Sequence, residues 1–170
     1  MDEVMNEELK FHQVAYVVRD LDSSVKHWAD NLGIGPWTVY TLKAPGLRDC
    51  VYKGTKTEFS LRHAMAFAGN MQFELVQPLE GPSIFMDQLN TIGEGMNHVG
   101  CIVQDHPAAV ADFLARGFTP LQSAAGFGAE GDGAFAYFQP PDGISAIVEL
   151  ISPPKVRIKP DYIYPAQEGA

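Results

Sequence analysis

The sequence predicts an α+β fold made of two tandem βαβββ modules, because one order of segments occurs twice along the chain. Residues 13–20 match residues 98–105 position by position, as an apolar run that closes on Asp. The segments Phe73-Glu74-Leu75 and Val148-Glu149-Leu150 match likewise, and each follows its partner segment by a comparable distance. A repeat of this kind indicates a duplicated supersecondary unit, and a site built between the two copies.

The first module is expected over residues 11–79. Residues 11–18 alternate and are rich in β-branched types, which is typical of a strand, and residues 20–32 carry apolar side chains at helical spacing before Gly33. Three further strands follow, at residues 37–42, 59–67 and 71–76, with a loop over residues 43–54. If Gly69-Asn70 forms a two-residue turn, Met65 pairs with Glu74 and His63 lies on the same face of the sheet.

The second module is expected over residues 97–151, after a linker helix within residues 80–96. Its strand, helix and three strands are predicted at residues 97–103, 107–116, 118–123, 134–138 and 145–151. Residues 126–131 spell a dinucleotide fingerprint but open no helix, so they predict a loop that closes over a cavity. Residues 1–10 form an N-terminal extension, and residues 152–170 an extended tail on the surface or on a partner.

The composition indicates a soluble globular chain. Hydrophobic residues make up 46% and charged residues 19% of the 170 residues, which suits one domain or two half-domains that share a core. No apolar run approaches the roughly 18 residues needed to cross a membrane, and residues 1–8 lack a signal-peptide pattern. The net charge of -9 argues against nucleic acid as a partner. Cys50 and Cys101 have no metal-ligand spacing, so we expect reduced thiols and a cytoplasmic location.

Four possible metal donors, Gln13, Glu74, His98 and Glu149, occupy equivalent places in the two modules. Because successive strand residues point to opposite faces, Gln13 shares a face with small residues, whereas His12 shares a face with bulky ones. The small-residue face is expected to line a cavity, which favours Gln13 as the donor. A bulge near the start of the strand would reverse the two faces, so His12 stays an alternative.

Charge is the physical reason to expect a metal ion. Burying an ionised carboxylate without a partner is costly, and no Lys or Arg recurs at positions that match Glu74 and Glu149. A divalent cation satisfies both carboxylates, with His98 and Gln13 as neutral donors, and this donor set suits Zn, Ni, Co, Mn or Fe. The alternative is that each Glu faces solvent on a half-exposed sheet.

Four segments together resemble the glyoxalase/bleomycin resistance/dioxygenase group, the vicinal oxygen chelate superfamily. They are Val14–Asp22, Phe73–Leu79, Gly93–Val99 and Ile147–Leu150. The resemblance implies that the two modules curl into a half-barrel cavity around a metal ion held by one donor from each of four strands. Carried over by position, the implied ligands are Gln13, Glu74, His98 and Glu149. Many relatives have His where this chain has Gln13, which argues against an extradiol dioxygenase, since those use two His and one carboxylate for Fe(II).

Within that group the chain looks most like methylmalonyl-CoA epimerase and glyoxalase I-like proteins. This likeness implies a metal-dependent lyase, isomerase or epimerase that removes a proton next to a carbonyl of a small organic acid or thioester. Glu149 is the expected base, Glu74 the second candidate, and His63 a further acid/base candidate.

Two other functions stay open, a metal-free small-molecule-binding protein of the bleomycin-resistance kind and an Fe(II) extradiol-type dioxygenase. Two retained carboxylates argue against the first and Gln13 argues against the second. Open half-barrels leave strand edges and apolar surface exposed, so a homodimer is expected.

Overall fold

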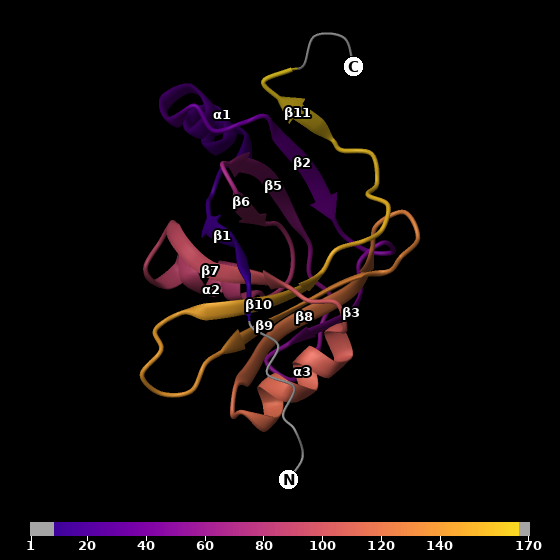
Figure 1. Cartoon of the computed structure of the whole chain (residues 1–170). Coiled ribbons are helices and arrows are strands. Elements are labelled where there is room, and N and C mark those ends of the chain that lie inside the picture. The colour runs from indigo at the N-terminus through magenta and orange to yellow at the C-terminus, as the bar shows by residue number, and fades with distance from the viewer. Residues whose placement is uncertain (1–8, 167–170) are drawn as a thin grey trace.

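The computed structural model describes residues 9–166, in which three helices pack against a single curled, open sheet (Figure 1). The helices are α1 (Leu21–Leu32), α2 (Ile84–Thr91) and α3 (His106–Ala115). The strands are β1 (Phe11–Val17), β2 (Trp37–Leu42), β3 (Arg48–Tyr52), β4 (Thr55–Lys56), β5 (Leu61–Ala68), β6 (Met71–Pro78), β7 (Gly95–Ile102), β8 (Thr119–Phe127), β9 (Gly133–Gln139), β10 (Ile147–Ser152) and β11 (Tyr162–Tyr164).

The predicted repeat is confirmed as two half-sheets with the same internal order. The first half runs β2-β5-β6-β1 and the second runs β8-β9-β10-β7. In each half the strands that come first and last along the chain, β1 with β6 and β7 with β10, pair in parallel. Strands β1 and β7 pair antiparallel and join the halves into one sheet. Helix α1 covers the outer face of the first half and α3 that of the second, at opposite ends of the molecule in Figure 1.

The Asp that closes each repeat has a structural role. Asp20 and Asp105 are the N-caps of α1 and α3, and their carboxylates accept hydrogen bonds from the backbone N–H of Ser23 and Ala108. Such a cap binds one of the N–H groups that a helix leaves unpaired in its first turn. Gly33 ends α1 in the left-handed region, with a φ of 66°, as the sequence predicts.

The loop expected over residues 43–54 is wrong in part. Residues 48–52 form β3, which pairs with β4 and also with β8, so a segment of the first half extends the sheet of the second. Two residues here, Asp49 and Lys53, have positive φ, and the pairing with β8 shifts register. This strand therefore depends on a distant partner, and a local alternation pattern does not reveal it.

Three apolar clusters hold the fold together. One lies under α1 and includes Trp37 and Leu75, and one lies under α3 and includes Phe113 and Leu150. The third fills the inside of the curled sheet, from Val17 to Tyr137. The sheet therefore has α1 and α3 on its outside and, on its inside, an apolar trough shared by both halves, to which α2 contributes Ile84, Phe85 and Leu89. No helix in the described part of the chain has both the length and the apolar character needed to span a membrane.

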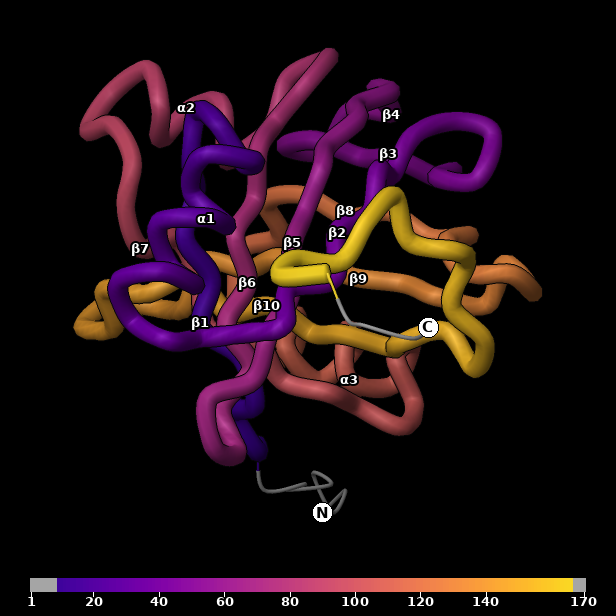
Figure 2. Tube along the Cα trace, turned by 90° about the horizontal axis from the view of Figure 1, so that it is seen from above, coloured from indigo at the N-terminus to yellow at the C-terminus, as the bar shows by residue number. Residues whose placement is uncertain are grey.

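The C-terminal segment lies on the chain itself. After β10 it crosses from the second half to the first, where β11 pairs antiparallel with β2 at the end of the sheet (Figure 2). The extended tail expected over residues 152–170 is thus seen over residues 152–166. The rest of that tail and most of the expected N-terminal extension, residues 167–170 and 1–8, lie outside the described residues.

Candidate metal centre

The four predicted donors come from four neighbouring strands at the centre of the sheet. Strands β6, β1, β7 and β10 lie in that order and carry Glu74, Gln13, His98 and Glu149. All four side chains are buried, with exposed fractions of 1% to 6%. Successive residues of a strand point to opposite faces of the sheet, and all four of these side chains point to the inner face of the curled sheet.

The side chains converge on one point. The Nε2 atom of His98 lies 3.0 Å from Oε2 of Glu149 and 3.4 Å from Oε2 of Glu74. One ligand atom each from Glu74, His98 and Glu149 lies within 4.8 Å of the others. This spacing is what a cation bound between the three groups requires.

Unpaired atoms identify the same point independently. Six buried side-chain atoms in residues 9–166 lack a hydrogen-bond partner, and four of them are Oε1 of Gln13, Oε2 of Glu74, Nε2 of His98 and Oε2 of Glu149. Leaving a buried polar atom without a partner costs about 1–3 kcal/mol, and more for a charged group. Glu74, His98 and Glu149 present such atoms to one another, and Gln13 on the neighbouring strand lines the same pocket, so the arrangement fits a divalent metal ion.

Neighbouring side chains bind the remaining polar atoms and so fix how the donors point. The Nδ1–H group of His63 donates to Oε1 of Glu74 at 2.7 Å, and that of His98 donates to Oδ1 of Asn97 at 2.8 Å. The second bond places the proton of the neutral His98 ring on Nδ1, so that loss of the other proton leaves a lone pair on Nε2, as metal binding needs. Gln13 donates from Nε2 to Oε1 of Gln72 at 2.9 Å, so its carbonyl oxygen turns toward the cluster.

Gly100 on β7 makes room for Gln13. A Cβ atom at this position would lie 2.7 Å from Oε1 and 3.1 Å from Cβ of Gln13, and 2.9 Å from Cδ1 of Ile151. Real Cβ atoms do not approach other heavy atoms so closely, so the side chain of Gln13 can lie across β7 only because residue 100 is glycine.

Burial and charge shift the protonation equilibria of the cluster in opposite directions. Burial raises the pKa of Glu149. For Glu74 burial acts in the same sense, but hydrogen bonds from His63 and then His98 outweigh it and lower the pKa. Burial tends to lower the pKa of His98, yet the charges of Glu149 and Glu74 raise it to about 9. Without a metal the two carboxyl groups therefore lie against the one imidazole of His98, and burial disfavours the ionised form of Glu149.

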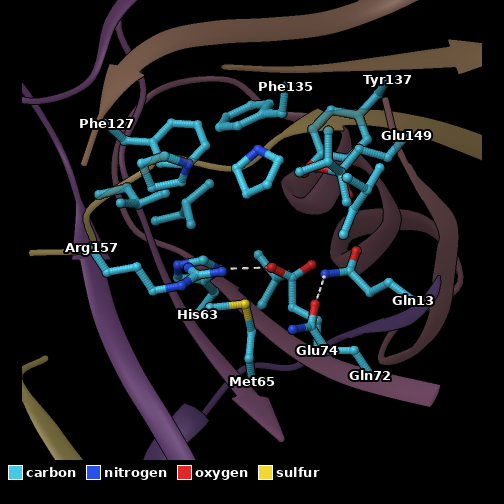
Figure 3. A pocket seen from close by; sticks show the side chains of 17 residues that line it. Gln13, His63, Met65, Gln72, Glu74, Phe127, Phe135, Tyr137, Glu149 and Arg157 are labelled. Carbon is cyan, nitrogen blue, oxygen red and sulfur yellow. Dashed lines mark hydrogen bonds and ion pairs between the residues drawn. The ribbon is translucent and has the colours of Figure 1, made fainter. Parts of the chain in front are cut away.

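A pocket opens from the trough beside this cluster, with a volume of about 620 Å³ including its open mouth (Figure 3). Gln13, His63, Glu74 and Glu149 form its polar wall. Most of the remaining lining is apolar or aromatic: Leu42, Leu61, Met65, Val76, Ile102, Phe127, Phe135, Tyr137, Ile151, Pro153 and Pro154. This lining suits a small organic molecule with an apolar body.

His63 lies where the expected hairpin puts it, since Met65 pairs with Glu74 across β5 and β6. His12 is half-buried on the other face of β1, and its Nδ1 accepts a weak hydrogen bond of 3.4 Å from the backbone N–H of Ile102. The pairing of β1 with β7 does shift register beside His12, but Gln13 is the residue whose side chain enters the cluster.

The sequence did not single out Gln72, Asn97 or Arg157. Gln72 and Asn97 each hold a donor by one hydrogen bond, and Arg157 lines the pocket from the C-terminal segment. Asn97 precedes His98 directly, which offers a weak signal. Arg157 lies in a segment with no local pattern, so only the folded chain places it.

Comparisons with known proteins agree with this fold. Residues 12–138 match the family model described as Glyoxalase/Bleomycin resistance protein/Dioxygenase superfamily. Among proteins with curated descriptions, none matches the chain.

Solved structures with similar folds include a hypothetical protein from Bacillus halodurans, with 16% identity, a TM-score of 0.64, and 86% of this chain and 96% of that one covered. Methylmalonyl-CoA epimerase from Mycobacterium tuberculosis has 22% identity and a TM-score of 0.60, with 84% and 87% covered. A variant of the Streptomyces coelicolor epimerase in complex with 2-nitronate-propionyl-CoA has 20% identity and a TM-score of 0.65, with 88% and 98% covered. With three quarters of its length matched by the family model and the same curled sheet, the chain belongs to the glyoxalase/bleomycin resistance protein/dioxygenase superfamily.

Proposed function

We propose that the chain is a divalent-metal-dependent enzyme that removes a proton next to a carbonyl group. The convergence of donor atoms from Glu74, His98 and Glu149, with the unpaired buried oxygen of Gln13 on the neighbouring strand, carries this proposal. Two carboxylates, an imidazole and an amide oxygen suit Zn, Ni, Co, Mn or Fe. When bound, such an ion polarises a carbonyl and stabilises the negative charge that develops as a neighbouring proton leaves.

Glu149 is the proposed proton acceptor. It lines the pocket, and its buried Oε2 has no hydrogen-bond partner among the described residues. Both oxygens of Glu74 have other roles, because His63 holds one and the other faces His98. In the proposed step the proton passes from the substrate carbon to a carboxylate oxygen of Glu149, and the electron pair of the C–H bond stays on the substrate as an enolate.

His63 is the proposed second proton carrier. Its Nδ1–H is bound to Glu74, so Nε2 carries the lone pair and is free to accept or return a proton at the pocket wall. Figure 3 shows His63 and Glu149 on different sides of the pocket. An epimerase or isomerase needs proton carriers at two positions around one substrate, so this arrangement favours those reactions over simple ligand storage.

The substrate class follows from the pocket and from similar folds. Its apolar walls suit the chain of a small organic acid or the acyl part of a thioester, and solved epimerases of the same fold hold CoA esters. A small-molecule substrate and a homodimeric assembly stay predictions, as does the cytoplasmic location.

Proton exchange in deuterated water tests the proposal directly. Metal-loaded protein is incubated with propionyl-CoA, methylmalonyl-CoA and simple oxo acids, and exchange of the α-proton is followed by NMR. The expected result is exchange with at least one probe, and a loss of about 100-fold or more in Glu149→Gln at equal bound metal. The matched control is Glu130→Gln, which removes the charge of an exposed residue and should exchange at the parental rate. Exchange that is absent with every probe, or unchanged in Glu149→Gln, would contradict the proposed chemistry.

A further inference from the structure

Arg157 gives the mouth of the pocket a positive charge. It is the one Lys or Arg among the described residues that line the pocket, whose wall otherwise carries the carboxylates of Glu74 and Glu149. Within residues 9–166 no carboxylate lies within ion-pair distance of Arg157. Its guanidinium lies over the ring of Tyr40, 5.9 Å from the centroid, which directs the side chain while leaving its N–H groups unpaired by acid.

The C-terminal segment holds Arg157 in place from both sides. Just before it, the carbonyl of Val156 accepts a hydrogen bond of 2.8 Å from the N–H of Ala129, in the loop between β8 and β9. After it, Asp161 bonds to β2 twice: its N–H donates to the carbonyl of Val39 at 2.8 Å, and its carboxylate accepts from the hydroxyl of Thr41 at 2.6 Å. The residues from Pro153 to Asp161 thus form a strap between the two halves of the sheet (Figure 2).

The loop under the strap is shaped for this contact. Gly128 has a φ of 95°, and a Cβ atom there would lie 2.2 Å from Cβ of Pro154. Only glycine allows the strap to lie so close to the loop. Pro154 and Arg157 also line a smaller hollow next to the pocket, together with Tyr40, Phe127 and His63. Arg157 is thus both exposed to solvent and part of the pocket lining.

We infer that Arg157 binds a carboxylate of the substrate, so that the enzyme takes a carbonyl compound with an apolar body and a carboxylate at its outer end. This inference rests on the proposed function for the position of the reacting carbonyl. The apolar body packs against Phe127, Phe135 and the facing leucines, while the planar guanidinium pairs with the carboxylate through two parallel hydrogen bonds. Such a charge offsets the repulsion between an anionic substrate and the two carboxylates of the site.

Calorimetric titration of metal-loaded protein with matched ligands tests the inference. The probes are 4-oxo-4-phenylbutanoate, which has an apolar ring, a carbonyl and a carboxylate, its neutral amide, and inorganic phosphate. The acid is expected to bind the parental protein more tightly than the amide does. Arg157→Met is expected to weaken binding of the acid by about tenfold while leaving the affinity for the amide unchanged. Arg157→Lys keeps the charge but not the planar guanidinium group. Its affinity for the acid is expected to lie between those of the parental protein and Arg157→Met.

Lys155→Met is the matched control, because it removes a positive charge from an exposed residue of the same strap that does not line the pocket. Its affinity for the acid should equal that of the parental protein. Equal loss in Lys155→Met and Arg157→Met would show a general charge effect and overturn the inference, as would unchanged acid binding in Arg157→Met or equal parental affinity for acid and amide. A loss confined to phosphate would assign Arg157 to a phosphate group and overturn the carboxylate assignment.

Two separate measurements distinguish this inference from the proposed function. Failure of the proposed function shows as protein that retains no metal and exchanges no α-proton, whatever Arg157 binds. Failure of the inference shows as protein that retains metal and exchanges protons, with an acid affinity that does not depend on Arg157.

Discussion

Replacing Glu149 with Gln should make the metal-free protein more stable. In the metal-free cluster Glu149 is buried beside Glu74 and shares the imidazole of His98 with it, so a negative charge on Glu149 is held at a cost in stability. A site that keeps such a charge gives up stability for the ability to bind a cation.

The size of the effect follows from three opposing contributions. With an effective dielectric constant of about 20, the repulsion from Glu74 at up to 4.8 Å costs about 3 kcal/mol. The attraction to His98 at 3.0 Å contributes about 5 kcal/mol in the opposite sense. Transfer of the carboxylate from water costs several kcal/mol, which brings the net cost to about 1–3 kcal/mol, in agreement with the pKa of Glu149 being raised by burial.

Urea unfolding of chelator-treated protein at neutral pH measures this difference. Glu149→Gln should raise the free energy of unfolding by about 1–3 kcal/mol, or Tm by about 2–10 °C. The gain should shrink as the pH falls below the pKa of Glu149, because a protonated acid carries no charge to remove. Added zinc should then stabilise the variant less than the parental protein. A metal-free variant that is less stable than the parental protein would refute the reasoning, and Glu130→Gln controls for loss of an exposed charge.

Three further changes test the surroundings of the cluster. His63→Phe, which removes the hydrogen bond to Glu74, should weaken metal affinity by about 10–100-fold in a competition titration with a chelator. His12→Ala should leave metal content unchanged. Loss of metal in His12→Ala would mean that His12 is the donor. Gly100→Ala should lower the free energy of unfolding by about 1–3 kcal/mol and displace Gln13. Gly46→Ala, where a Cβ atom has room, should do neither. Equal metal affinity in the two variants would contradict the role given to Gln13. Hydrogen bonds with Arg62 and then Tyr162 lower the pKa of Asp22, so Asp22→Asn should reduce the free energy of unfolding by about 1 kcal/mol or less at pH 7. The difference should be lost as the pH falls through the pKa of folded Asp22. An equal difference at both ends of a pH series would rule out the ionised carboxylate as the cause.

Much of the fold and the grouping of Glu74, His98 and Glu149 could be predicted because the chain repeats itself, while metal binding by these residues and Gln13 stays a prediction. The duplicated segments placed Gln13, Glu74, His98 and Glu149 at equivalent positions, and a two-residue strand period was enough to separate Gln13 from His12. The hairpin between β5 and β6 was predictable for a local reason, since a tight turn at Gly69-Asn70 fixes the register of His63.

The parts that could not be predicted depend on partners far away in the sequence. Strand β3 exists because β8 of the other half accepts it; Asp49 within the strand and Lys53 just after it both have positive φ. The strap is extended and rich in proline, so nothing local shows that it crosses the pocket or that Arg157 lines it. The side chains of Gln72 and Asn97 gain their roles only through single hydrogen bonds to donors. Short-range patterns cannot encode such contacts, because these need the folded sheet to bring the groups together.

Metal content of the purified protein, measured by elemental analysis before and after dialysis against a chelator with Tm followed in parallel, tests the four-donor site most directly. We predict close to one equivalent of Zn, Ni, Co, Mn or Fe per chain, whose removal lowers Tm and whose return restores it. Protein that carries no metal, and whose Tm does not change when any of these metals is added, would contradict the site and leave a metal-free small-molecule-binding protein as the better description.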